Sequence, residues 1–197
     1  MVETTRRQAI EDVASDLFRE HGYAATSIRD IARALSVQGA SLYAHVTSKE
    51  DVLWAIVERA AARFETAADG AELEAEAHRP GDAAEAIAAL LEAHVDVLTA
   101  DVDEAAVFVN EWRSLGEERR RQILDRRDAY QARFRRHVEA GIAVGVFAMT
   151  DPSIAASSIL SAINGVAVWY DPNGRLPADR IADHLVDLVL RMLEGSR

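Results

Sequence analysis

The chain has no cysteine, only four prolines among 197 residues, and a single lysine, Lys49. Without cysteine it can form neither disulfides nor thiolate metal sites. The scarcity of proline and of β-branched runs favours helices over strands. The most apolar stretch, residues 154–170, is interrupted by three serines and an asparagine, so we expect no membrane-spanning helix. Residues 1–10 lack the apolar core of a signal peptide, and we expect a cytoplasmic protein.

Patterns that mark many enzymes are also missing. None of the six histidines follows a glutamate by three residues, the pairing that builds di-iron sites in helical bundles. The sequence has neither the zinc-binding HExxH pattern nor the phosphate-binding GxxxxGK pattern. We therefore expect no catalytic residue, no metal and no cofactor.

Charge is distributed unevenly along the chain, whose net charge is -11. Residues 1–50 carry six basic against seven acidic side chains, whereas residues 51–197 carry 16 against 26. The acidity therefore belongs to the C-terminal part, which should face away from any polyanion. The nearly neutral N-terminal part does not exclude contact with phosphates.

The segment ATSIRDIARALSVQGASLYAHVTSKED, residues 25–51, is the most informative part of the chain. It follows an amphipathic helix that ends near Gly22 and whose inward face is predicted to carry Ile10, Val13, Ala14, Leu17 and Phe18. Thr26 is the predicted N-cap of a second helix, and no full capping box is expected because Arg29 lies three residues later. A break at residues 36–37 precedes a third helix, predicted over residues 38–45. The apolar positions that would face inward are Ile28, Ile31, Ala32, Leu35, Leu42 and Val46.

Two short helices joined by a tight turn are the pattern of a helix-turn-helix, whose second helix enters the major groove of DNA. Short polar side chains such as Gln38 and Ser41 suit base edges. Hydroxyls and a cation suit phosphates, and Thr26, Ser27, Tyr43 and Lys49 could supply them. An ordinary helical hairpin with exposed polar residues would give the same pattern.

Residues 10–54 resemble the N-terminal domain of the TetR family of bacterial repressors through LFREHGYAATSIRDIA, SLYAHV and SKEDVL at fixed spacing. The resemblance implies an all-α protein of about nine helices that forms a homodimer. It implies a three-helix DNA-binding domain, residues 1–50, and a larger ligand-binding and dimerisation domain, residues 51–197. The residues that it places against a double-stranded DNA operator are Thr26, Ser27, Gln38, Gly39, Ala40, Ser41, Tyr43, His45 and Lys49.

This segment departs from the family pattern at three places. Glycine is usual at Ser36, so we expect a non-glycine residue with positive φ and modest strain there. Lysine and glycine are usual at Gly39 and Ala40, which leaves base readout to fewer side chains. Phenylalanine is usual at Val46.

Beyond the helix-turn-helix, apolar periodicity predicts helices over residues 48–68, 82–99, 102–113, 117–144, 152–170 and 177–194. The acidic stretch 69–81 is predicted to be a loop or a frayed helix end. The last two helices carry more apolar residues than one core needs. Two such helices from each of two chains would form a closed four-helix interface; packing within one chain is the alternative.

Eight of the arginines lie between residues 119 and 136 of this acidic region. They could bind an anionic effector, or they could pair with acidic residues on a solvated helix face. Aromatic side chains at helical spacing and an asparagine within an apolar helix could line a pocket or belong to the core. The predicted ligand-binding residues are Phe108, Trp112, Arg127, Tyr130, Phe134, Asn164 and Trp169.

A finer resemblance comes from EWRSL (111–115), RRDAY (126–130), NGVAVWY (164–170) and GRL (174–176). These motifs are similar to a TetR branch whose effectors are acyl-CoA thioesters, although several of its members have an aromatic residue at Gly165. The resemblance implies a repressor that a small-molecule effector, an acyl-CoA, releases from its operator. A helical-bundle enzyme and a dimeric adaptor that does not bind DNA are the alternatives.

Overall fold

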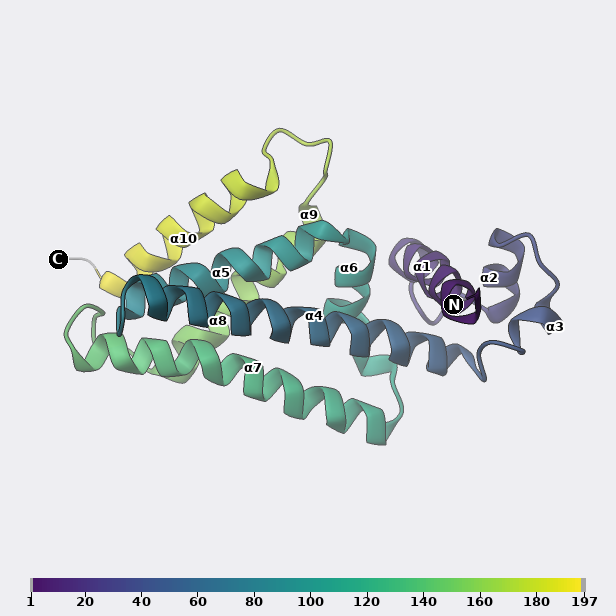
Figure 1. The fold of residues 1–197 in the computed structure, drawn as a ribbon, viewed down its shortest axis with the longest axis horizontal. Helices are drawn as coiled ribbons and strands as arrows, with labels where there is room; N and C mark the ends of the chain where they lie inside the picture. Colours follow the sequence, from purple (N-terminus) through teal and green to yellow (C-terminus); the bar gives the residue numbers. More distant parts are fainter. Residues whose placement is uncertain (1, 196–197) are drawn as a thin grey trace. The chain divides into compact units, whose positions relative to one another are not determined.

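The computed structural model describes the backbone of residues 2–195 and the side chains of residues 6–195. Every regular element in this range is helical, which confirms the predicted all-α class (Figure 1). In chain order the elements are α1 (Val2–His21), α2 (Ile28–Ala34), α3 (Gly39–Leu42), α4 (Lys49–His78), α5 (Ala83–Ala100), α6 (Val102–Asn110), the 3-10 turn η1 (Trp112–Ser114), α7 (Glu117–Ala143), α8 (Pro152–Asn164), α9 (Val166–Trp169) and α10 (Ala178–Glu194).

The chain forms two compact units. The first contains the residues up to Ala61 together with Asp101–Leu124, and the second contains Ala62–Ala100 and the residues from Asp125 onward. Helices α4 and α7 therefore belong to both units, and α6 belongs with α1–α3. The boundary predicted at residue 50 separates a DNA-binding domain from a ligand-binding domain. It stays a prediction, because the two units are defined by packing and not by function.

The first unit is built on a small apolar core beneath the helix-turn-helix. Ile10 and Phe18 of α1, Ile31 of α2 and Leu42 of α3 are almost completely buried. The ring of Phe18 meets that of Tyr23 edge-on, with centroids 5.2 Å apart. The apolar spacing therefore predicted the inward faces of these helices correctly.

The predicted cap of α2 was wrong. Ser27 is the N-cap, and it forms a capping box with Asp30, which was not expected from the sequence. The Ser27 hydroxyl and amide hold the pKa of the Asp30 carboxyl below its usual value. Thr26 instead turns inward, where its hydroxyl donates to the carbonyl oxygens of Gly22 at 3.0 Å and Leu17 at 3.3 Å. Two adjacent hydroxyl residues compete for the cap, and burial of Thr26 decides between them.

The turn between α2 and α3 contains the strained residue that the sequence predicted. Ser36 has φ +55°, the only positive φ of a non-glycine residue among those described. Helix α3 is shorter than the predicted 38–45, because it ends at Leu42 and residues 43–45 form a turn. The His45 amide closes that turn by donating to the Leu42 carbonyl at 2.8 Å.

In the second unit, α5 packs against α8, α9 and α10. A loop or a frayed helix end was predicted at 69–81, and this was wrong for most of the stretch, because α4 continues as a helix to His78. Ala71 and Ala75 are buried one turn apart, so this acidic stretch has an apolar face that continues the helix. The helix predicted over 152–170 is divided near Gly165 into α8 and α9.

A hydrogen-bonded histidine lies in the core of the second unit. His94 on α5 is 3% exposed, and its Nδ1 is 3.0 Å from the Tyr130 hydroxyl and its Nε2 is 3.2 Å from Asn164 Oδ1. Burial lowers the pKa of His94 to about 3, so the ring is neutral. Because the carboxamide oxygen only accepts, Nε2 carries the hydrogen and Nδ1 accepts from Tyr130. The three side chains connect α5, α7 and α8.

We expect His94 to make the protein acid-sensitive. The unfolded chain binds a proton as the pH falls below 6.5, whereas folded His94 stays neutral to about pH 3. Its contribution to stability is therefore complete above pH 6.5 and declines between these values, by about 1.4 kcal/mol per pH unit while only the unfolded form is protonated.

Chemical denaturation at pH 6.5 and pH 5 tests this expectation. His94→Gln should show a smaller loss of unfolding free energy across this interval than the unsubstituted protein. The matched control is His78→Gln, at an exposed position. Equal losses in the unsubstituted protein and the His94→Gln variant would show that His94 is not the acid-sensitive group.

Candidate nucleic-acid interface and effector pocket

The predicted base-reading side chains lie on the surface of the first unit. Gln38, at the N-cap position of α3 but without a side-chain capping hydrogen bond, is exposed, as are Ala40 and Ser41 within the helix. Tyr43 directly follows α3 and is 60% exposed, which is unusual for so large an aromatic side chain. Gly39 and His45 are half-buried. A short helix thus presents small polar groups with one phenol beside them, a set that can hydrogen-bond to base edges and phosphates.

Lys49, at the start of α4, has a structural task in the same unit. Its Nζ donates to the carbonyl oxygens of Tyr23 at 2.7 Å and Thr26 at 2.8 Å. It also lies 4.0 Å from the centroid of the Tyr23 ring, within cation–π range. These contacts fasten the turn between α1 and α2 to the first residue of α4. Two of the three ammonium donors are therefore directed inward.

Thr26 and Ser27 differ in their access to solvent. Thr26 is 3% exposed, so its hydroxyl is not at the surface. Ser27 is exposed, but its hydroxyl is 2.5 Å from the Asp30 carboxylate. Arg29, in the first turn of α2, is exposed and was not among the predicted contacts. The available signal was its place in the first turn of the first helix of the motif, two residues after the Ser27 cap.

The predicted ligand-binding residues do not form one group. Tyr130, Phe134 and Asn164 lie in the second unit, where His94 joins the tyrosine to the asparagine. The Tyr130 and Phe134 rings are in contact, with centroids 5.9 Å apart. Phe108 and Trp112 are buried in the first unit. Sequence reasoning missed His94 because a lone histidine in an alanine-rich helix has no pattern of its own.

Two other predicted residues occupy different environments. Arg127 is half-buried, and its positive charge contributes to the lowered pKa of His94. Trp169, in α9, is 57% exposed and borders a shallow surface hollow with Arg175 and Leu176. Trp169 is therefore not part of the buried group.

Tyr130 also borders a cavity of about 310 Å³ on the second unit. The other lining residues are Glu65, Arg126, Ala129, Arg133 and Arg136. The cavity thus combines three guanidinium groups, a carboxylate and a phenol. Arginine forks of this kind bind carboxylates and phosphates with two parallel hydrogen bonds.

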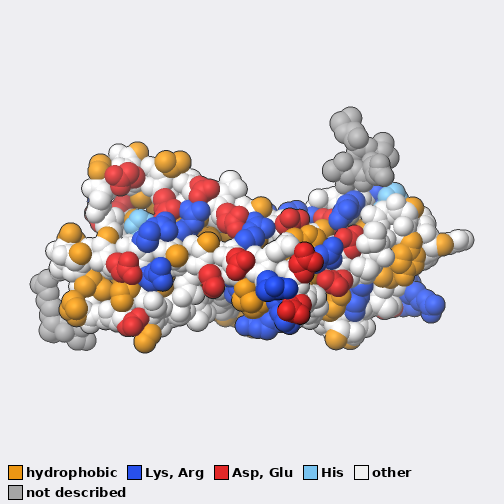
Figure 2. Space-filling model, turned by 90° about the horizontal axis from the view of Figure 1, so that it is seen from below, with side chains coloured by type: hydrophobic (Ala, Val, Ile, Leu, Met, Phe, Trp, Pro, Cys, Tyr) orange, Lys and Arg blue, Asp and Glu red, His pale blue; other side chains and the backbone are white. Residues whose placement is uncertain are grey.

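At least six of the eight arginines of α7 pair with carboxylates, and four of these six reach across to α4. Arg126 makes two 2.7 Å hydrogen bonds with Glu65, and Arg133 contacts both Asp69 and Glu72 at 2.6 Å. Pairing within α7, the alternative considered from sequence, occurs for Arg121 with Glu117 and for Arg135 with Glu139. Basic and acidic side chains are accordingly interspersed on the face drawn in Figure 2.

An apolar surface remains exposed on the last helices. Ile154 of α8 is 65% exposed, and Leu188 and Met192, one turn apart on α10, are 62% and 50% exposed. By length and composition, residues 152–169 could cross a membrane, which by itself is weak evidence. Four serines of α8 line a hollow of about 540 Å³ with Ile154. The mixture of hydroxyls and aliphatic groups suits a protein surface better than lipid.

Comparisons with known proteins agree with this arrangement. Residues 10–56 match the bacterial regulatory proteins of the tetR family, and residues 80–193 match the tetracyclin repressor-like C-terminal domain. The chain is 28% identical over 192 residues to the HTH-type transcriptional repressor KstR2 of Rhodococcus jostii (strain RHA1), across 94% of this chain and 89% of that protein.

Solved structures show the same fold. The TetR family transcriptional regulator PfmR from Thermus thermophilus has a TM-score of 0.80 and 31% identity, across 92% of this chain and 96% of that one. AibR, solved in complex with isovaleryl coenzyme A and operator DNA, has a TM-score of 0.79 and 27% identity, across 93% and 97%. This protein therefore belongs to the tetR family of bacterial regulatory proteins and is a ligand-responsive regulator of transcription.

Proposed function

We propose that the protein is a homodimeric repressor that binds a DNA operator through α3 and leaves it when an effector binds the second unit. The observation that carries the proposal is the exposed set Gln38, Ser41 and Tyr43 on a short helix held by a capped partner helix. Such a helix can lie in the major groove, with its small side chains at base edges. Because it would act on the bacterial chromosome, we also propose a cytoplasmic location.

The proposed contacts divide by chemistry. Gln38 and Ser41 would read bases, while Tyr43 and Arg29 would meet phosphates. The small residues Gly39 and Ala40 would let the α3 backbone approach the groove, and His45 and Ser27 would lie at its edge. Burial withdraws Thr26 from direct contact. Lys49 would act first by holding the turn below α2, with one ammonium hydrogen left for a phosphate.

The proposed dimer uses the exposed apolar surface of α8 and α10. Ile154, Leu188 and Met192 would be covered by the same surface of a second chain, which closes a two-fold interface. A dimer places two copies of α3 at fixed separation. Successive major grooves on one face of B-DNA are about 34–36 Å apart, so the dimer would fit an operator with two half-sites.

The proposed effector site is the cavity beside Tyr130. Arg126 and Arg133 could exchange their carboxylate partners for the phosphates of a coenzyme A ester. The Tyr130 hydroxyl, which donates to the neutral His94 ring in this structure, would turn to donate to an uncharged acyl carbonyl, because both ring nitrogens of His94 are already hydrogen-bonded. The structural similarity to AibR, which was solved with isovaleryl coenzyme A, supports this ligand class.

We expect Gln38→Ala and Tyr43→Phe to affect DNA binding differently. Loss of a base contact should cost about 1–3 kcal/mol on the preferred operator and little on other duplexes. Loss of the Tyr43 hydroxyl should cost about 1 kcal/mol on every duplex. Fluorescence anisotropy with the protein's own upstream DNA and an unrelated duplex measures both.

Tyr170→Phe is the matched control, because it removes a phenol hydroxyl in the second unit. It should leave both affinities unchanged. A Tyr43→Phe effect confined to the preferred operator would contradict the phosphate role, and an unchanged operator preference in Gln38→Ala would remove that residue from base readout.

We expect isovaleryl coenzyme A to release the DNA at concentrations where isovalerate and coenzyme A alone do not. The thioester alone combines phosphates for the arginines with a carbonyl for Tyr130. Tyr130→Phe should raise the thioester concentration needed for release by about fivefold, the value of one neutral hydrogen bond. Release by the free acid but not by the thioester would contradict the ligand class.

A further inference from the structure

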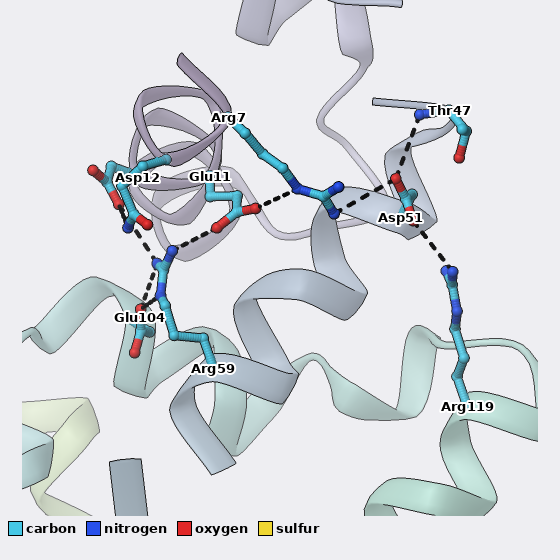
Figure 3. Close-up of polar contacts among 9 residues, drawn as sticks. Arg7, Glu11, Asp12, Thr47, Asp51, Arg59, Glu104 and Arg119 are labelled. Carbon is cyan, nitrogen blue, oxygen red and sulfur yellow. Dashed lines mark hydrogen bonds and ion pairs between the residues drawn. The ribbon is translucent and has the colours of Figure 1, made fainter. Parts of the chain in front are cut away.

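Six side chains of alternating charge form a continuous chain of ion pairs through the first unit (Figure 3). Their order is Glu104, Arg59, Glu11, Arg7, Asp51 and Arg119. The N–O separations along the chain are 2.5, 2.5, 3.0, 3.8 and 3.3 Å. We refer to this set of residues as the ion chain.

The ion chain visits four helices in turn. It starts on α6 at Glu104, passes through Arg59 of α4 to Glu11 of α1, and returns to α4 at Asp51. It ends on the first turn of α7 at Arg119. Helix α1 is therefore tied by charge to three helices that are distant from it in sequence.

Arg59 is the member on which the others depend. The side chain of Glu104 is 3% exposed and that of Glu11 is 8% exposed, and the guanidinium of Arg59 lies between them. Buried carboxylates are very unfavourable when they lose a cationic partner. The planar fork of arginine can hold two carboxylates at once, which a lysine ammonium does less well. A shift of α6 therefore either moves α1 with it or leaves two buried charges poorly paired.

The far end of the ion chain reaches the DNA-reading segment. Asp51 Oδ2 accepts a 3.4 Å hydrogen bond from the amide of Thr47, in the connection between α3 and α4. On the α6 side, Glu104 follows α5 by only a few residues, and α5 carries His94. On the α7 side, the helix that begins near Arg119 continues to Tyr130. The two helices that carry the proposed effector site thus lead directly into the ends of the ion chain.

We propose that Arg59 is a positioning residue for operator binding, and that the ion chain transmits displacements of α6 and α7 to α1 and to the α3–α4 connection. This inference rests on the proposed function, since it assigns a route between the effector site and the DNA surface. Arg59 itself touches neither ligand. It acts by keeping α1, and thus the core beneath α2 and α3, in register with α6.

Arg59→Lys keeps the charge and removes the fork, so it tests positioning rather than charge. The exposed pair Arg121–Glu117, at 3.7 Å in the same unit, provides the matched control Arg121→Lys. Two measurements are made on each full-length variant. One is amide hydrogen exchange in α1 and α6, and the other is operator affinity with and without isovaleryl coenzyme A.

Arg59→Lys should unfold cooperatively, exchange faster in α1 and α6, and bind the operator about 5- to 150-fold more weakly, the usual range for coupling between sites. Its affinity should also respond less to the thioester. Arg121→Lys should match the unsubstituted protein. Arg119→Gln, at the α7 end of the ion chain, is the second variant, and it should show the same changes to a smaller extent without leaving a buried carboxylate unpaired.

Unchanged exchange in α1 and unchanged operator affinity in folded Arg59→Lys would overturn the proposal. A lower unfolding temperature with unchanged affinity and unchanged effector response would also overturn it, because it would leave Arg59 a stabilising role alone. If the unsubstituted protein did not bind its upstream DNA, the proposed function would fail, whereas faster exchange in α1 of Arg59→Lys would still establish the ion chain as a clamp.

Discussion

The hydrogen bonds from Lys49 to the carbonyl oxygens of Tyr23 and Thr26 are the contacts on which the DNA-reading surface depends. Carbonyl groups in a turn lie outside the helical hydrogen-bond ladders, and this ammonium donates to two of them, although Tyr23 also accepts from the Thr26 amide at 3.3 Å. It fixes the turn after α1 against the start of α4, and α2 then begins at a capping box instead of fraying. The position of α3 follows from this arrangement. Its inward residue, Leu42, packs into the small core that α1 and α2 form.

Many charged side chains of this acidic protein are paired between helices. Carboxylates of α4 hold the arginines of α7 in the second unit, and carboxylates of α1 and α6 hold Arg59 in the first. Pairing removes equal numbers of both signs and leaves the net charge of -11 unchanged, and most of this excess lies in residues 51–197 and not in the helix-turn-helix. Separating a partly buried ion pair costs far more free energy than separating an exposed one. Helices joined by partly buried pairs should therefore move together.

Sequence reasoning recovered what periodicity and backbone geometry determine locally. Apolar spacing gave the inward faces of α1–α3, and the resemblance to a family with glycine at this position predicted the positive φ of Ser36. Sequence reasoning failed where tertiary packing chooses between equal local options, as with Thr26 and Ser27 at the cap of α2. The acidic end of α4 was taken for a loop because its charges hid the spacing of Ala71 and Ala75. Neither His94 nor the ion chain could be found, since their partners are brought together only by the fold.

The central claim is that two copies of this chain present α3 to DNA at a fixed separation. Hydroxyl-radical footprinting of the purified protein on its own upstream DNA tests that claim most directly. The account predicts two protected patches related by two-fold symmetry, with centres about one helical turn, roughly 34–36 Å, apart. A single patch without a symmetric counterpart, or uniform weak protection along the duplex, would contradict it.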